Sequence, residues 1–205
     1  MLKNLGVPCE TLPIRADTGD IVLFHSKHIS SYGTKLFTLS QWDHVGFVIR
    51  WTNSNLKLFE ATSLGVGLYK LSSRLEFLHT DNKIAFRRLK AERNREMMKN
   101  LNEFVEQMRG RPFKKEFSEI IGAVIKKDVN NRKDENLSSV FCSELVAAAY
   151  QKMGILTDKI SCNAFLPKDW ADKNGSLLKF ENSAELERKR IFSKKKARKT
   201  SLFKK

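Results

Sequence analysis

Short apolar runs separated by polar turns dominate the first ninety residues. Residues 19–24 form one run after a Gly-Asp turn signal, residues 44–51 form a second, and residues 56–62 form a third after an Asn-Ser-Asn turn. Runs of this length and composition indicate buried strands, and the last two predict a β-hairpin. A further strand of the same antiparallel sheet is expected near residues 84–89.

Two later segments carry the spacing of helices. Residues 93–108 place large apolar side chains three and four positions apart, which predicts a helix with one buried face, and Gly110 follows as a C-cap. Residues 141–153 are rich in strong helix formers, and Gly154 ends them. The buried positions expected in the first helix are Met97, Leu101, Phe104, Val105 and Met108.

Length and composition favour one domain with a tail. A chain of 205 residues with 41% hydrophobic content is long enough for one substantial core and short for two. We expect the domain to occupy residues 1–180. Residues 181–205 turn polar and then basic, so we expect a flexible tail there.

The net charge of +15 is concentrated near the C-terminus. From residue 186 to 205 there are ten Lys or Arg and one acid, a charge of +9, so the rest of the chain carries only +6. Such a basic segment could contact nucleic acid or an anionic membrane, serve as a nuclear address, or simply keep the protein soluble. Ile191, Leu202 and Phe203 interleave with the bases and slightly favour a membrane surface.

Several classes of protein are disfavoured by what the sequence lacks. No stretch approaches the roughly 18 apolar residues of a spanning helix, and the first residues lack the apolar core of a secretory signal, so an intracellular, cytoplasmic protein is expected. The three cysteines, Cys9, Cys142 and Cys162, are odd in number and widely spaced. They predict neither a disulfide framework nor a zinc site, and no metal or organic cofactor is expected.

One cysteine and one histidine have the placement that nucleophilic catalysis needs. Cys142 falls in the first turn of the expected helix, where a thiolate is favoured, and His44 begins a strand next to a glycine. Glu60, on the second arm of the hairpin, has the parity to share a face with His44 and could orient its ring. A symmetrical turn at Ser54 would leave Glu60 nearer Val48, so a bulge or longer loop is needed.

Neighbouring polar residues receive weaker assignments. Ser143 points about a quarter turn away from Cys142 and lacks the surroundings of a serine nucleophile. Glu144 is interpreted as an exposed carboxylate of the first helical turn, and Asp20 as a structural cap of the turn before the first strand. His25 and His28 precede the hairpin and could line the site.

Four motifs, in this order, resemble the circularly permuted papain-like cysteine hydrolases of the NlpC superfamily. The nearest branch is that of the YiiX/YaeF-like amidases, and lecithin:retinol acyltransferase is more distant. The resemblance spans roughly residues 18–170, with the histidine strand before the nucleophile helix as in that superfamily. The motifs are Gly19-Asp20-Ile21, Asp43-His44-Val45-Gly46, Phe59-Glu60-Ala61 and Phe141-Cys142-Ser143-Glu144-Leu145-Val146.

The resemblance implies an α+β fold with a central antiparallel sheet and a nucleophile-bearing helix packed on it. It further implies a thiol-dependent hydrolase with Cys142 as nucleophile, His44 as base and Glu60 as third polar residue. The substrate would be an amide (peptide, isopeptide or N-acyl) or an acyl ester. A lipid acyltransferase or phospholipase-like enzyme at a membrane, or a non-catalytic anion-binding protein on the same fold, stays open. The sequence does not indicate the oligomeric state.

Overall fold

The computed structural model describes most of the region that the motifs cover. The described residues are 16–25, 41–52, 55–62, 64–79, 83–111, 142–171 and 177–192. The strands are β1 (Ile21–His25), β2 (His44–Thr52), β3 (Asn55–Thr62), β4 (Gly65–Lys70), β5 (Lys83–Arg87), β6 (Leu89–Lys90), β7 (Glu185–Leu186) and β8 (Arg190–Phe192). The helices are α2 (Leu71–His79), α3 (Arg95–Met108), α5 (Cys142–Lys152) and the short 3-10 helix η3 (Cys162–Ala164).

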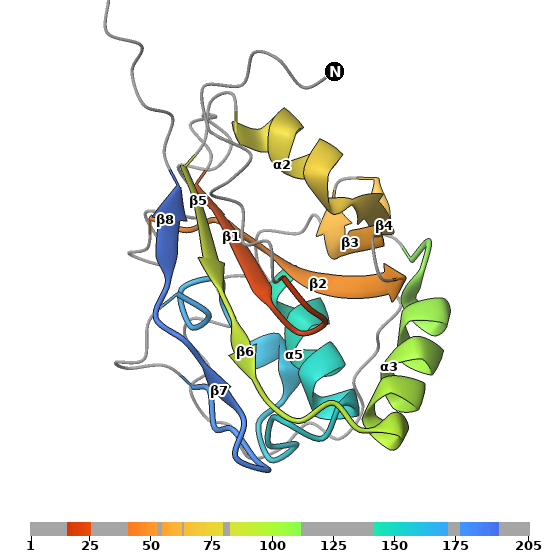
Figure 1. The fold of residues 1–205 in the computed structure, drawn as a ribbon. Helices are drawn as coiled ribbons and strands as arrows, with labels where there is room; N and C mark the ends of the chain where they lie inside the picture. The colour runs from red at the N-terminus through yellow and green to blue at the C-terminus, as the bar shows by residue number, and fades with distance from the viewer. Residues whose placement is uncertain are drawn as a thin grey trace, which may run out of the picture.

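A six-stranded antiparallel sheet forms the centre of the fold (Figure 1). Its strand order is β4-β3-β2-β1-β5-β8, and each neighbouring pair is antiparallel. Because the sheet is antiparallel throughout and its helices do not connect parallel neighbouring strands, the predicted α+β class with a central antiparallel sheet is confirmed. The strands expected at residues 19–24, 44–51, 56–62 and 84–89 correspond to β1, β2, β3 and β5 with β6.

The two faces of the sheet carry different helices. Helices α5 and α3 pack together on the face that presents Val45, Phe47 and Phe59. Helix α2 covers the opposite face, where Leu71 and Leu75 pack with neighbours from the strands. This segregation follows from the two-residue period of strands, since successive side chains point to opposite faces.

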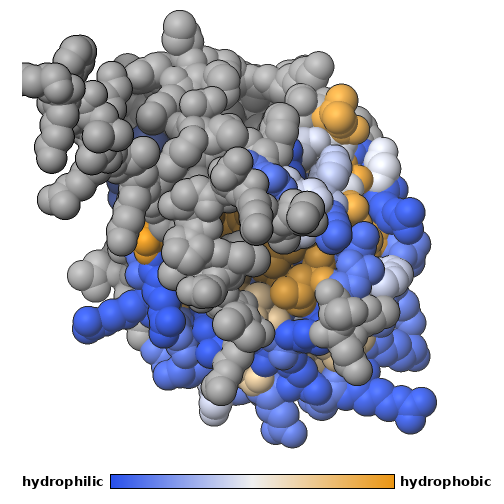
Figure 2. Space-filling view, turned by 45° about the horizontal axis from the view of Figure 1, so that its top comes forward, coloured by the Kyte–Doolittle hydropathy of each residue, from blue (hydrophilic) through white to orange (hydrophobic). Residues whose placement is uncertain are grey.

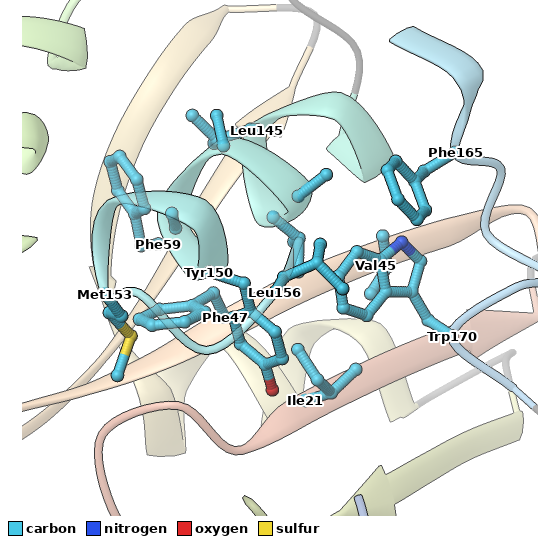
Figure 3. Packing of buried hydrophobic residues seen from close by; sticks show 14 of the residues in the cluster. Ile21, Val45, Phe47, Phe59, Leu145, Tyr150, Met153, Leu156, Phe165 and Trp170 are labelled. Atoms are coloured by element: carbon cyan, nitrogen blue, oxygen red, sulfur yellow. The ribbon is translucent and has the colours of Figure 1, made fainter. Parts of the chain in front are cut away.

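The larger part of the core lies between α5 and the sheet (Figure 3). Every residue of α5 from Cys142 to Tyr150 is buried, which is why its apolar pattern runs almost all round the helix. Tyr150 packs edge-on against Trp170 with ring centroids 5.1 Å apart, and against Phe47 at 5.6 Å. Burial of large side chains contributes about 1.5–3 kcal/mol each, so α5 is held firmly against β2.

Helix α3 confirms the sequence prediction of a buried face. The five positions expected to be buried are the ones that are buried. Asn94 caps the helix through its side chain, which accepts from the Met97 backbone N–H at 2.8 Å. Gly110 has φ +79° just past the end, the left-handed conformation of a helix C-terminus.

The hairpin of β2 and β3 contains the bulge that the predicted site requires. Phe47 lies opposite Phe59, and the register shifts between Arg50 and Thr52. Because of that shift Val48 faces Leu58 rather than Glu60. Glu60 is thereby moved toward the start of β2, where His44 lies.

Strands β7 and β8 lie beyond residue 180, in the segment that composition predicts as a tail. Strand β7 pairs with β6, and β8 pairs with β5 as the edge of the main sheet. The buried guanidinium of Arg87 donates to the backbone carbonyls of Trp170, Leu186 and Glu187 at 2.7, 3.1 and 2.8 Å. The fold therefore includes residues up to Phe192, while residues 193–205 lie outside the described part.

The surface of the described residues is mainly polar. Figure 2 shows one face, on which hydrophilic residues line much of the rim and hydrophobic residues gather near the centre. Large hydrophobic side chains that are exposed in the described part are Trp51, Leu64 and Ile191. None of the described helices combines the length and apolar character needed to cross a bilayer.

Candidate active site

Cys142 is the first residue of α5 and is 6% exposed. Helix α5 packs on β2 and β3, so the thiol is brought to the sheet that carries the other two predicted residues. The start of the helix is fixed by its second residue, because the Ser143 hydroxyl donates to the Phe165 carbonyl at 2.7 Å. The backbone N–H groups of the first helical turn have no partner within the helix and favour negative charge nearby.

His44 is the first residue of β2, with a side chain that is 22% exposed. Its position is set by β1, since the Asp43 N–H donates to the Phe24 carbonyl at 3.1 Å. The Phe24 ring lies beside the imidazole, with centroids 5.5 Å apart. His44 hydrogen-bonds Cys142, so the structure brings together the thiol and the imidazole that the sequence predicted as partners.

Glu60 on β3 is fully buried and holds the other side of the imidazole. Its Oε2 atom is 2.6 Å from Nε2 of His44. With Nε2 engaged by the carboxylate, Nδ1 is the ring nitrogen left for Cys142. The Oε1 atom of Glu60 accepts from Nε of Arg74, a residue of α2 that sequence reasoning missed.

The charges of these groups reinforce one another. Burial alone would lower the pKa of His44, but the charges and hydrogen bonds of Cys142 and Glu60 raise that pKa to about 10. Burial alone would raise the pKa of Glu60, but His44 and Arg74 hold it below its ordinary value. An ionised Glu60 beside a protonated His44 is therefore the favoured state over the neutral pH range.

The polar residues that received weaker assignments from the sequence differ in how the structure places them. Glu144, interpreted as an exposed carboxylate, is 3% exposed, because α5 is buried on all sides at its start. Asp20 has the structural role expected of it: its carboxylate accepts from the backbone N–H groups of Asp17 and Leu89, at 2.9 and 2.8 Å. His25 interacts with the carbonyl of Gln41.

Two other cysteines and one histidine were weighed in the sequence. Cys162 is fully buried and its thiol donates to the side chain of Gln151 at 2.8 Å, as a structural residue would. Cys9 and His28 lie outside the described residues.

Comparison with protein families matches residues 15–200 to the permuted papain-like amidase enzymes described as YaeF/YiiX. The chain belongs to this family. The family confirms the resemblance deduced from the motifs, and its description as an amidase agrees with the predicted cysteine hydrolase at that coarse level. The predicted acyltransferase alternative receives no support from it.

A similar solved structure is that of YiiX from Escherichia coli O157:H7, which is described as a metalloprotein. The two share 24% sequence identity with a TM-score of 0.50, over 67% of this chain. This chain spans 66% of the length of that structure, and the likeness bears on the fold alone. A search among curated proteins finds no match.

Proposed function

We propose that this member of the YaeF/YiiX family hydrolyses an amide bond through an acyl-enzyme on Cys142, with His44 as acid and base and Glu60 as the residue that orients His44. The observation that carries the proposal is the position of the imidazole, which is hydrogen-bonded to Cys142 and lies 2.6 Å from a fully buried carboxylate. An isolated buried cysteine would need no such partner. A peptide, isopeptide or N-acyl amide would each suit this chemistry.

In the acylation step the Cys142 sulfur attacks the carbonyl carbon of the amide. A bond forms between Sγ and that carbon, and the carbonyl oxygen becomes an oxyanion that the backbone N–H groups at the start of α5 support. When the C–N bond breaks, the imidazolium of His44 gives its proton to the leaving amine. The raised pKa of His44 means that this proton is present at neutral pH.

In the deacylation step a water molecule attacks the thioester carbonyl. His44 takes a proton from that water, the C–S bond breaks, and the proton returns to the Cys142 sulfur. Once the sulfur is acylated it bears no charge, so one of the two groups that raise the pKa of His44 no longer acts. The same histidine can then act as a base, because its proton is held less firmly than in the free enzyme.

The description of YiiX as a metalloprotein raises the question of a metal in this chain. Among the described residues, no group of three His, Cys, Asp or Glu side chains could hold a metal ion. Next to Cys142, His44 already makes hydrogen bonds to two side chains, those of Cys142 and Glu60.

Partners and location stay predictions. We propose that the basic segment within residues 181–205 contacts an anionic partner, either membrane head groups or nucleic acid, and that the enzyme acts inside the cell. The support is the charge of that segment in the sequence.

The proposed function is tested by comparing the wild-type protein with Cys142→Ala and with Cys162→Ala as the matched control. Each is incubated with peptide amides, isopeptides, N-acyl amides, thioesters and phospholipids, and covalent acylation is followed by mass spectrometry. We expect Cys142→Ala to lose labelling and at least about 10³-fold in turnover, as removal of a nucleophile does. Cys162→Ala should keep both. Equal labelling and turnover in wild type and Cys142→Ala would refute the proposal.

A further inference from the structure

Arg74 contacts the buried carboxylate on the side away from His44. Its Nε donates to Oε1 of Glu60, while His44 occupies Oε2, so the carboxylate lies between two cationic groups. The side chain of Arg74 is 20% exposed and that of Glu60 is fully buried. A contact so well shielded from solvent is much stronger than a surface ion pair.

The neighbouring elements place Arg74 there. Leu71 and Leu75, one helical turn apart, anchor α2 on the sheet, and Arg74 lies between them in the sequence. The guanidinium lies over the ring of Tyr69, 5.3 Å from its centroid. Tyr69 can take this position because a glycine lies two residues earlier: a Cβ on Gly67 would come within 2.8 Å of the Tyr69 ring.

Gly67 is also the residue of β4 directly opposite Glu60. The absence of a side chain at this point leaves the space beside the carboxylate to Tyr69 and Arg74. Among the described residues, the charged and titratable groups that act on His44 and Glu60 from other elements are Cys142 of α5 and Arg74 of α2, and Tyr69 of β4 lies against the guanidinium of Arg74.

We infer that Arg74 is a positioning residue whose fixed positive charge allows His44 to release its proton during deacylation. This inference rests on the proposed function. While His44 is protonated, its charge and that of Glu60 cancel. When it gives up the proton, a net negative charge is left in a buried site, and only a permanent cation can balance it. A guanidinium is such a cation, because it stays protonated at every pH at which a protein is folded.

Arg74 therefore acts differently on the two halves of the reaction. With an ester whose leaving group departs as an anion, acylation uses the thiolate and the protonated His44 that it contacts, and His44 keeps its proton during that step. Deacylation uses a neutral His44 beside an ionised Glu60, a state that depends on Arg74. Loss of the arginine should slow the second step and leave the first largely intact.

The test uses p-nitrophenyl acetate, which separates the two steps. The Cys142 sulfur forms a bond to the acetyl carbon and expels p-nitrophenolate, so an initial burst measures acylation. Water then cleaves the thioester to acetate and restores the thiol, so the steady rate measures deacylation. Both rates are followed against pH for wild type, Arg74→Gln, Arg74→Met and Arg74→Lys. Glu76→Gln, an exposed change on the same helix, is the control.

We expect Arg74→Gln and Arg74→Met, which lack the charge, to keep the burst. In both variants the acidic limb of the pH profile, where the steady rate falls as pH is lowered, should move about one pH unit upward. At pH values below this limb the steady rate should therefore be about tenfold lower than in the wild type. Arg74→Lys, which keeps the charge, should keep the wild-type limb. Met is assayed beside Gln because its unbranched stem preserves the packing near Tyr69, and thermal melting shows which variants are folded at the assay temperature.

Other outcomes overturn the inference. Burst and steady rate that fall in proportion in the neutral variants, with an unmoved limb, would mean that Arg74 only supports the fold of α2. A burst that is the same in Cys142→Ala as in wild type would refute the proposed function and with it this inference. A burst that requires Cys142 together with an unmoved limb refutes the role of Arg74 alone.

Discussion

The substitution Glu60→Gln separates the charge of the carboxylate from its ability to orient His44. The amide is nearly the same shape as the carboxylate, and its oxygen can still accept from Nε2 across the 2.6 Å contact. The negative charge is lost. The ring of His44 should stay in place, while the proton that it carries should be held less firmly.

The size of the effect follows from the geometry. Two unit charges about 4 Å apart attract by about 4 kcal/mol at an effective dielectric constant of about 20, and one pKa unit corresponds to about 1.4 kcal/mol. Carboxylates at this distance shift a neighbour by about 1–3 units. Since the His44 side chain is 22% exposed, we take the middle of that range. The pKa of His44, raised to about 10 in the wild type, should fall by about 2 units.

The sign determines which part of the pH profile changes. A raised histidine pKa keeps the imidazolium present below that pKa, and the imidazolium is lost as pH rises through it. In Glu60→Gln, amide turnover should therefore begin to fall at a lower pH on the alkaline side of the profile. Turnover in the neutral range should be kept. The measurement is an NMR titration of the His44 ring, assigned with a His44→Asn variant. A midpoint that stays near the wild-type value in Glu60→Gln would refute the electrostatic reasoning.

Two further predictions concern the scaffold. Gly65→Ala should lower the free energy of unfolding more than Gly110→Ala: both glycines have positive φ, which costs about 1–2 kcal/mol for alanine, but only at Gly65 would the new Cβ meet a backbone atom, the Arg111 carbonyl oxygen at 2.6 Å. Denaturant melts of the two variants check the order, and equal losses would contradict it. Burial raises the pKa of Asp20 to about 6, whereas at Asp17 partial burial is outweighed by the Thr18 backbone N–H and nearby arginines, which hold the pKa below its ordinary value. Carboxyl ¹³C titrations should therefore show two aspartates, three residues apart, with midpoints displaced in opposite directions, and coincident midpoints would show that reasoning to be wrong.

The strands and helices that carry Cys142, His44 and Glu60 could be predicted because each has a strong local pattern. The hairpin arms are continuous apolar runs, and the nucleophile helix is rich in helix formers. The need for a bulge in the hairpin could also be deduced. A symmetrical turn would leave Glu60 nearer Val48 than His44, although parity places Glu60 and His44 on the same face. What joins these elements depended on the resemblance to a family, since no local pattern states that residue 142 lies beside residue 44.

Arg74 was missed because the sequence around it lacks a clear pattern of secondary structure. Strand β4 contains Gly65 and Gly67, which lower strand propensity, and α2 has little amphipathic character. Their roles are tertiary: the glycines are required where a carbonyl and an aromatic ring approach closely. Such requirements cannot be recognised before the neighbours are known.

The last strands were missed for a different reason. Strands β7 and β8 have only two and three residues and lie in a stretch where charged residues of both signs outnumber apolar ones, which resembles a solvated tail. Edge strands often carry such charges, because charged side chains discourage pairing with other molecules. The burial of Ala184 and Leu186 shows that this stretch belongs to the fold.

The three carbonyl groups bound by Arg87 set a limit on where the chain can be shortened. Two of them belong to residues 186 and 187, beyond the boundary that composition suggests. A protein ending at residue 180 would keep the buried arginine and lose two of these three carbonyl groups. A protein that ends after Phe192 keeps all three of these carbonyl groups, so it is a better starting point than one ending at residue 180 for measuring what the basic terminus binds.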